Sequence, residues 1–315
     1  MAEEDRDAAA SLAHRGAFET PRIAPLESVR GLLALWVVVG HVGRRVLTDD
    51  ELLRWHLRAA LEPMLPVYVF MMLSGFVIFL LLDRGDEPLG VFLARRLFRL
   101  APLYLALLLL SASLLSFQLR VLEALPWRSG EILDDIKIHA EAIANFWPHF
   151  AAHLLLLQGL FSDKLLFEST YTILSQSWSI SLEWQFYLLA PLLFFLLRTR
   201  RLLLLILTLA AVTAVGRLGY GGVAFLPNMF FYFALGILSY YAYGAARPAK
   251  GFEPELLDAA LLVVSASFYF FLKEPWPLIA WLFLLASVIA EKTGDHSLVT
   301  KAIAKASALQ PLRWL

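Results

Sequence analysis

The chain consists of long apolar blocks separated by short polar connections. A transmembrane helix needs about 20 mostly apolar residues. The blocks are continuous and rich in leucine and alanine, which favours helices over the alternating strands of outer-membrane barrels. The pattern therefore predicts an all-α, polytopic membrane helical bundle of about nine or ten transmembrane helices. The eight clearest blocks are residues 31–47 (lengthened by 25–30), 64–82, 100–119, 177–197, 202–215, 225–243, 256–272 and 276–290.

A ninth segment, residues 146–161, leaves the topology open. Its clean apolar run covers only residues 154–157, and it carries His149 and His153. A full span, a re-entrant piece and a surface helix are all compatible with this pattern. If the segment spans, the arginines of residues 198–201 lie outside the cell, and if it does not, they lie inside. Because Lys and Arg concentrate on the cytoplasmic side, charge counting favours a segment that does not span.

Composition narrows the class of protein. With 59% hydrophobic and 17% charged residues, the 315-residue chain is too apolar for a soluble or disordered protein. The 27 basic and 27 acidic residues balance to zero, so we expect no nucleic-acid partner. The absence of cysteine excludes disulfides, thiolate catalysis and zinc–thiolate or iron–sulfur sites.

The first 22 residues differ from the rest of the chain. They are polar and charged, and they lack the apolar core of a signal peptide. We expect residues 1–22 to be a disordered cytoplasmic tail and residues 23–315 to form one transmembrane domain.

Charged side chains inside apolar blocks point to a structural or functional role, because burying a charge in the bilayer costs free energy. Arg30 and His41 are eleven residues apart, which places them on nearly one helix face and roughly 16 Å apart along the axis. In one interpretation Arg30 is an interfacial anchor and His41 is a histidine in a helix-packing contact. In the other, His41 exchanges a proton near neutral pH. Neither cysteine nor an acidic neighbour suggests a metal site here.

Two further groups stand at helix ends. Arg96 and Arg99, at i and i+3, form either a positive-inside anchor or a clamp for phosphate. Ser179, Glu183 and Tyr187 form a polar stripe at i, i+4 and i+8 on an otherwise apolar helix. Glu183 lies at lipid depth, so it is either a structural partner in a hydrogen bond or salt bridge, or a catalytic group.

The other histidines are expected to lie at the surface or the membrane interface. His149 and His153 have the i, i+4 spacing of a metal pair, but no third ligand follows at helical spacing, so no metal site is predicted. The remaining members of this group are His14, His56, His139 and His296.

Four stretches together resemble the acyltransferase family 3 membrane proteins. These are the Arg-x10-His of residues 30–41, the Ser-Gly-Phe of residues 74–76, the Arg-x-x-Arg of residues 96–99, and the Trp-Ser-x-x-x-Glu of residues 178–183. Each is weak alone, but their order and spacing on membrane helices make the resemblance specific, and it extends over essentially the whole chain.

Two positions depart from the family pattern. Many relatives carry a second glutamate after the first, where this chain has Trp184, so no role of that acid is carried over. Relatives also end with another membrane helix, whereas residues 311–315 look like the approach to it, so the expected domain is one helix short.

The resemblance implies transfer of an acyl group, often acetyl, from cytoplasmic acyl-CoA to a hydroxyl of a sugar, glycan or other small molecule, without a metal. It implies a protein of the bacterial inner membrane with its N-terminus in the cytoplasm. His41 would be general base or transient acyl carrier, with Glu183 as second catalytic residue. The donor would be held by Arg30, Arg96 and Arg99, and the acceptor side lined by Ser74, Trp178, Ser179 and Tyr187.

A transporter or exporter is the alternative from another class, since buried His, Glu and Arg also mark ion pathways. The chain shows no inverted repeat and no paired helices broken by glycine or proline, which disfavours that alternative. A purely structural membrane subunit is the third possibility, and it leaves the three groups of ionisable residues unexplained.

Overall fold

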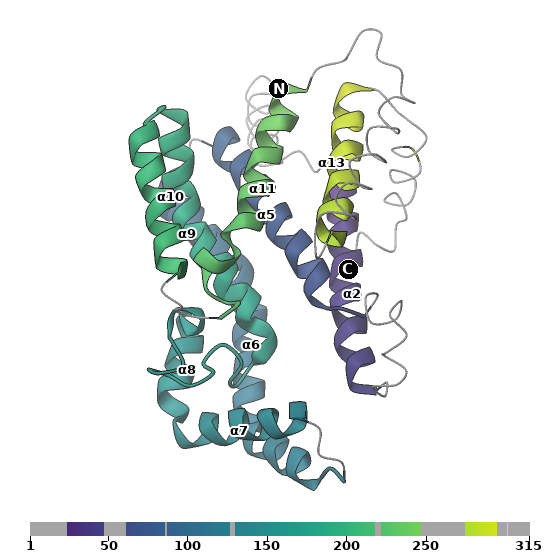
Figure 1. Ribbon diagram of the computed structural model, residues 1–315, viewed down its shortest axis with the longest axis vertical. Coiled ribbons are helices and arrows are strands. Elements are labelled where there is room, and N and C mark those ends of the chain that lie inside the picture. The colour runs from purple at the N-terminus through teal and green to yellow at the C-terminus, as the bar shows by residue number, and fades with distance from the viewer. Residues whose placement is uncertain are drawn as a thin grey trace, which may run out of the picture. The chain divides into compact units, whose positions relative to one another are not determined.

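The computed structural model describes residues 24–46, 61–85, 87–126, 130–217, 222–246, 275–294 and 301 (Figure 1). The predicted tail at residues 1–22, the apolar block 256–272 and the end at 311–315 lie outside these residues. Every regular element in the described ranges is a helix. The prediction of an all-α membrane bundle is confirmed.

The chain divides into two compact units, each described by itself: residues 1–70 with 242–315, and residues 71–241. In the first unit, α2 (Ala24–Val46) packs against α13 (Trp276–Thr293). Gly294 ends α13 in the left-handed conformation, with φ of 77°, which glycine adopts without steric cost.

The second unit holds most of the candidate site residues. It comprises the greater part of α5 (Met64–Arg84), together with α6 (Leu89–Ala124), α7 (Gly130–Ala144), α8 (Phe146–Leu154), the short 3-10 helices η1 (Gln158–Leu160) and η2 (Ser175–Ser177), α9 (Trp178–Arg198), α10 (Leu202–Arg217) and most of α11 (Leu226–Ala245).

Four helices in the described ranges are long and apolar enough to cross a membrane, namely α5, α6, α9 with its preceding turn, and α13. Shorter apolar helices cover Val29–Gly43 and Leu202–Arg217. The described part of the chain therefore contains fewer full-length spans than the nine or ten predicted. One reason is that α10, with 16 residues, is shorter than a full span. Another is that the predicted block 256–272 lies outside the described residues.

Helix α6 is much longer than the predicted block at residues 100–119. Its 36 residues correspond to about 54 Å, nearly twice the roughly 30 Å of a bilayer core. The helix begins directly after Pro88 and includes the arginines that precede the apolar block. At its far end it packs against α7, as Figure 1 shows. The apolar pattern thus marked only the lipid-depth part of a longer helix.

The α-helix of the doubtful segment 146–161 is the nine-residue α8, which is followed by the short 3-10 helix η1. Nine residues give about 14 Å of helix, which is too short to span a bilayer. The end of α5, the start of α6 and the end of α9 line one shared cavity, so these three ends lie together. The arginines of α6 and of residues 198–201 are consequently at the same end of the second unit, as expected when segment 146–161 does not span.

The Ser-Gly-Phe stretch has a direct packing explanation. A Cβ atom on Gly75 would overlap the carbonyl oxygen of Phe233, and one on Gly236 would overlap that of Met72. Helices α5 and α11 therefore approach backbone to backbone, which only glycine permits. Phe76 follows as a core residue with 2% exposure, and this close packing fixes the depth of Ser74 in the second unit.

Candidate functional site

Two hydroxyl groups converge on the carboxylate of Glu183. Tyr187, one turn further along α9, donates its hydroxyl hydrogen bond to Oε1 of Glu183. Ser74 Oγ, from α5, donates to the same oxygen at 3.1 Å. Tyr187 is 4% exposed and Glu183 is half-buried. A carboxylate at this depth requires such donors, because burying it without partners is costly.

Arg96 adds positive charge to this group. Its guanidinium interacts electrostatically with Glu183 and Tyr187, and it lies over the Phe92 ring at 5.9 Å. The Nε atom of Arg96 is buried and makes no hydrogen bond. Arg99 is exposed and also contributes to the field at Tyr187. We refer to Ser74, Arg96, Glu183 and Tyr187 as the Glu183 cluster.

The structure therefore brings together residues that the sequence placed on three separate motifs. The two other predicted acceptor-side residues lie just before the cluster, at the start of α9. Trp178 is buried at 8% exposure, and Ser179 is half-buried one turn before Glu183.

Arg30 and His41 lie on α2, in the first unit. His41 is exposed, and its Nδ1 is 2.8 Å from the carbonyl oxygen of Val37. A carbonyl accepts only from a protonated nitrogen, so in the neutral tautomer that makes this contact Nδ1 carries the proton and Nε2 the lone pair. Arg30 is half-buried. His41 belongs to the first unit and Glu183 to the second, so their pairing stays a prediction.

Trp184, the departure from the family pattern, does not join the Glu183 cluster. It packs against a buried hydrophobic cluster that includes Tyr104, Leu108 and Leu156. Adjacent helix positions point about 100° apart, so a side chain after Glu183 faces different neighbours. At this position an indole extends the core of the second unit.

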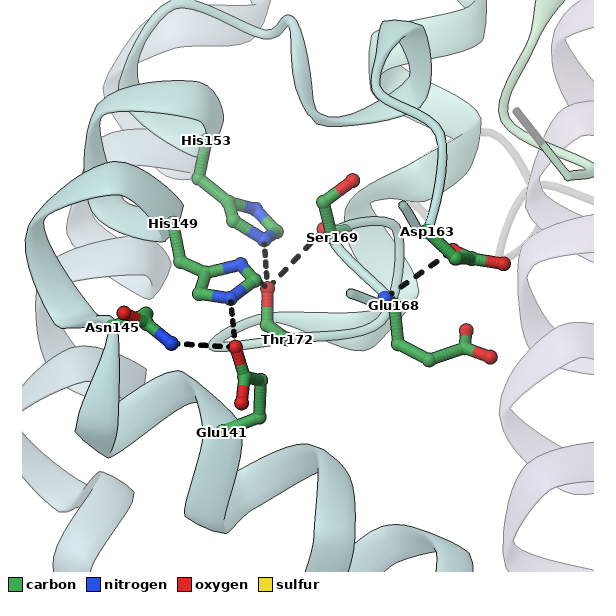
Figure 2. Close-up of polar contacts among 8 residues, drawn as sticks. All are labelled: Glu141, Asn145, His149, His153, Asp163, Glu168, Ser169 and Thr172. Carbon is green, nitrogen blue, oxygen red and sulfur yellow. Dashed lines mark hydrogen bonds and ion pairs between the residues drawn. The ribbon is translucent and has the colours of Figure 1, made fainter. Parts of the chain in front are cut away.

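The expectation that His149 and His153 lie at the surface or the interface is wrong. Both are fully buried, and Thr172 Oγ1 lies between them, 3.0 Å from Nδ1 of His149 and 3.3 Å from Nε2 of His153 (Figure 2). Ser177 Oγ is 3.4 Å from Nδ1 of His153. On the other side, Glu141 Oε1 is 3.9 Å from Nε2 of His149. We call these five residues the buried histidine network.

The network owes its burial to residues 155–177, which fold back against α8. Ser181 Oγ of α9 donates to the carbonyl of Leu156 at 2.8 Å, and Gln158 Nε2 donates to Ser177 Oγ at 3.2 Å. Tyr104 of α6 donates to the carbonyl of His153 at 2.6 Å. The i, i+4 spacing identified the pair of histidines, but nothing local in the sequence indicated that a distant segment would cover them.

Burial keeps both imidazoles neutral. Desolvation, together with the neighbouring His149, lowers the pKa of His153 to about 4. Desolvation also lowers the pKa of His149, although Glu141 opposes this shift. Within the described residues, no three His, Asp or Glu side chains converge to hold a metal ion. The network is a set of neutral hydrogen bonds that joins α8 to the start of α9.

Comparison with known families decides the class of the protein. The family model described as an acyltransferase domain, that of acyltransferase family 3, matches residues 23–290. The chain belongs to this acyltransferase family. No match was found among the curated proteins or the solved structures. The matched range of this family 3 acyltransferase includes α2 and the whole Glu183 cluster. The long apolar helices of the chain make it a membrane protein.

Proposed function

We propose that the protein is an integral membrane O-acyltransferase that moves an acyl group, in the simplest case acetyl, from acyl-CoA to a hydroxyl of a carbohydrate or other small acceptor. The observation that carries the proposal is that the Ser74 and Tyr187 hydroxyls converge on the Glu183 carboxylate, in the electrostatic field of Arg96. Polar groups inside apolar helices are costly, and in a member of an acyltransferase family a role in acyl transfer explains why they are kept.

Charge supports a cytoplasmic donor site. The arginines of α6 and of residues 198–201 share one end of the second unit, and such clusters mark the cytoplasmic side of a bacterial inner membrane. Since α5 ends on that side, one crossing by α2 would also place the N-terminus in the cytoplasm. Arg96 and Arg99 would bind the phosphates of the donor through their planar forks, and Arg30 would be a further anionic contact.

In the proposed reaction the acceptor hydroxyl oxygen attacks the thioester carbonyl carbon, so a C–O bond forms and the C–S bond breaks. His41 Nε2 takes the hydroxyl proton and passes it to the departing sulfur, which leaves as the CoA thiol. Glu183 orients His41 or holds the acceptor, together with Ser74, Tyr187, Trp178 and Ser179. In the variant with a relay, His41 carries the acyl group itself and then transfers it.

Substituting His41 tests the assignment of the base. His41→Ala should lower turnover by about 10²–10⁴-fold, the usual contribution of a general base, when CoA thiol release is followed with purified protein. His139→Ala is the control, since that half-buried histidine binds Gln118 on the α6 surface. Normal turnover by folded His41→Ala protein overturns its catalytic role.

The arginines give a separate test of the donor. Replacing Arg96 and Arg99 with glutamine should raise the KM for acyl-CoA, whereas a fall in protein level alone would identify them as membrane anchors. A transporter would release no thiol from acyl-CoA in any variant. Mass spectrometry of cell-surface glycans and secreted products with and without the gene would identify the acceptor by the gain of one acyl mass.

A further inference from the structure

A cavity of about 590 Å³ opens where the end of α5, the start of α6 and the end of α9 meet. Its volume lies in the range of small-molecule sites, which is about 300–1,000 Å³. The walls are mostly apolar and include the rings of Phe92 and Phe194. Arg198, Thr199 and Glu87 supply the polar groups of the lining.

The charge around this cavity favours an anion. Arg198 lies over the Phe194 ring at 6.0 Å, and Arg96 lies over the Phe92 ring at 5.9 Å. The carboxylate of Glu87 is neutralised by Arg95 at 2.8 Å. Two aromatic walls, each carrying an arginine, suit a ligand that combines a flat ring with phosphate groups.

The cavity and the Glu183 cluster share helices α6 and α9. On α9, Phe194 and Glu183 are eleven residues apart, which corresponds to about 16 Å along the axis. On α6, Arg96 stands one turn beyond Phe92, between the cavity and the cluster. A ligand anchored at the cavity would therefore need a long, thin arm to bring a reactive group to Glu183.

We propose that this cavity binds the adenosine–phosphate end of acyl-CoA, an assignment that rests on the proposed function. The adenine occupies the apolar space lined by Leu89 and Phe195, which are exposed to it. Arg198 binds one phosphate and Arg96 another, and the pantetheine arm then carries the thioester to Glu183. CoA has this shape, a flat base and phosphates joined to a long arm that ends in the reactive sulfur. Arg198 thus binds the acyl donor, in addition to marking the cytoplasmic end of the helix.

The test measures CoA binding and kinetics with the purified full chain in lipid nanodiscs. Arg198→Gln should raise the Kd of CoA at least tenfold and raise the KM for acetyl-CoA while kcat is kept. Arg200→Gln removes the same charge from an exposed position outside the cavity lining and should stay within twofold of the wild type. With acetylpantetheine, which lacks the nucleotide end, Arg198→Gln and the wild type should give equal turnover.

A second pair of variants tests the volume of the cavity. Leu89 lines the cavity and is 54% exposed, so Leu89→Trp fills the space without disturbing the core. It should weaken CoA binding at least tenfold, whereas Leu103→Trp, at a 70% exposed position of the same helix, should not.

The outcomes separate this inference from the proposed function. If the wild type neither binds CoA nor releases it from acetyl-CoA, the acyl-CoA donor itself is wrong. If the wild type binds CoA while Arg198→Gln and Leu89→Trp keep its Kd, the cavity is not the nucleotide site and the proposed function stands. A co-purified phospholipid in the cavity that CoA does not displace, detected by native mass spectrometry, also overturns the inference.

Discussion

The Glu183 cluster and the buried histidine network are two polar regions of the same unit with opposite physical character. The cluster holds a half-buried carboxylate beside arginine charge, and the arginine has a donor atom without a hydrogen-bond partner. In the network, His149, His153 and Thr172 are fully buried and the imidazoles are neutral. The cluster shares α6 and α9 with a cavity, whereas the network is covered by residues 155–177.

The difference shows that burial of a histidine is a poor guide to chemistry. A buried network of neutral imidazoles and hydroxyls acts as a cross-link between elements. A carboxylate placed among hydroxyl donors and arginine charge is instead typical of a functional site. Four predictions follow the comparison from the largest expected effect to the smallest.

Glu183→Gln should cause the largest loss of activity. Glutamine keeps the size of the side chain but removes the charge, so turnover should fall by about 10²–10⁴-fold, as for a catalytic acid or base. Glu141→Gln makes the same change in the buried histidine network and should stay within about twofold of the wild type. Equal losses in both variants of folded protein would contradict the distinction between the two regions.

Acid should destabilise the network through His153. Its pKa is about 4 in the folded protein against an ordinary 6.5, so below pH 6.5 the unfolded chain binds a proton that the folded chain excludes. The stabilisation is complete above pH 6.5 and is lost as the pH falls to 4, by on the order of 3 kcal/mol. Unfolding in mixed micelles across this range should show a shallower pH dependence for His153→Gln than for the wild type.

Thr172→Val removes the hydroxyl between the two histidines without changing the side-chain shape. The buried imidazole nitrogens lose their shared partner, so the free energy of unfolding should fall by about 2 kcal/mol. The matched control is Thr213→Val, since Thr213 is exposed and bonds only the Leu209 carbonyl of its own helix. Turnover of folded Thr172→Val protein should be near normal, and a kcat loss comparable to that of Glu183→Gln would assign the network a part in catalysis.

Ser74→Ala should have the smallest effect of the four. It removes one of two hydroxyl donors to Glu183 while the Tyr187 donor is kept. A hydrogen bond to a charged group is worth about 1.5 kcal/mol at the low end, which applies to a half-buried carboxylate with a second donor, so turnover should fall about tenfold and less than in Glu183→Gln. Ser113→Ala, an exposed serine that bonds its own helix at Leu110, serves as the control. Unchanged turnover in Ser74→Ala would remove this serine from the site.

Several sequence predictions concern local properties, and these agree well with the structure. The block at residues 177–197 corresponds to α9 (Trp178–Arg198), because apolar length and leucine content act within the segment itself. The stripe of Glu183 and Tyr187 also follows from helical period alone. Length was underestimated for α6, because its charged first turns carry no apolar signal.

The site itself could be predicted only in part. Motif order suggested that Ser74, Arg96 and Glu183 act together, but the Ser74–Glu183 hydrogen bond and the electrostatic interaction of Arg96 with Glu183 depend on how α5, α6 and α9 pack. The burial of His149 and His153 could not be predicted, since their cover comes from Thr172 and Ser177 about twenty residues away. The cavity beside Arg198 has no sequence signature, because three helix ends form it.

The sequence by itself determined the membrane class, the helical elements and the residues whose charge is costly at lipid depth, because these follow from the hydrophobicity and period of each segment. The tertiary structure decided that α8 is too short to span, which the sequence left open, that two arginine groups share one end, and that residues 155–177 cover one histidine pair. Contacts between distant segments set these relations, and such contacts join residues that no local pattern connects.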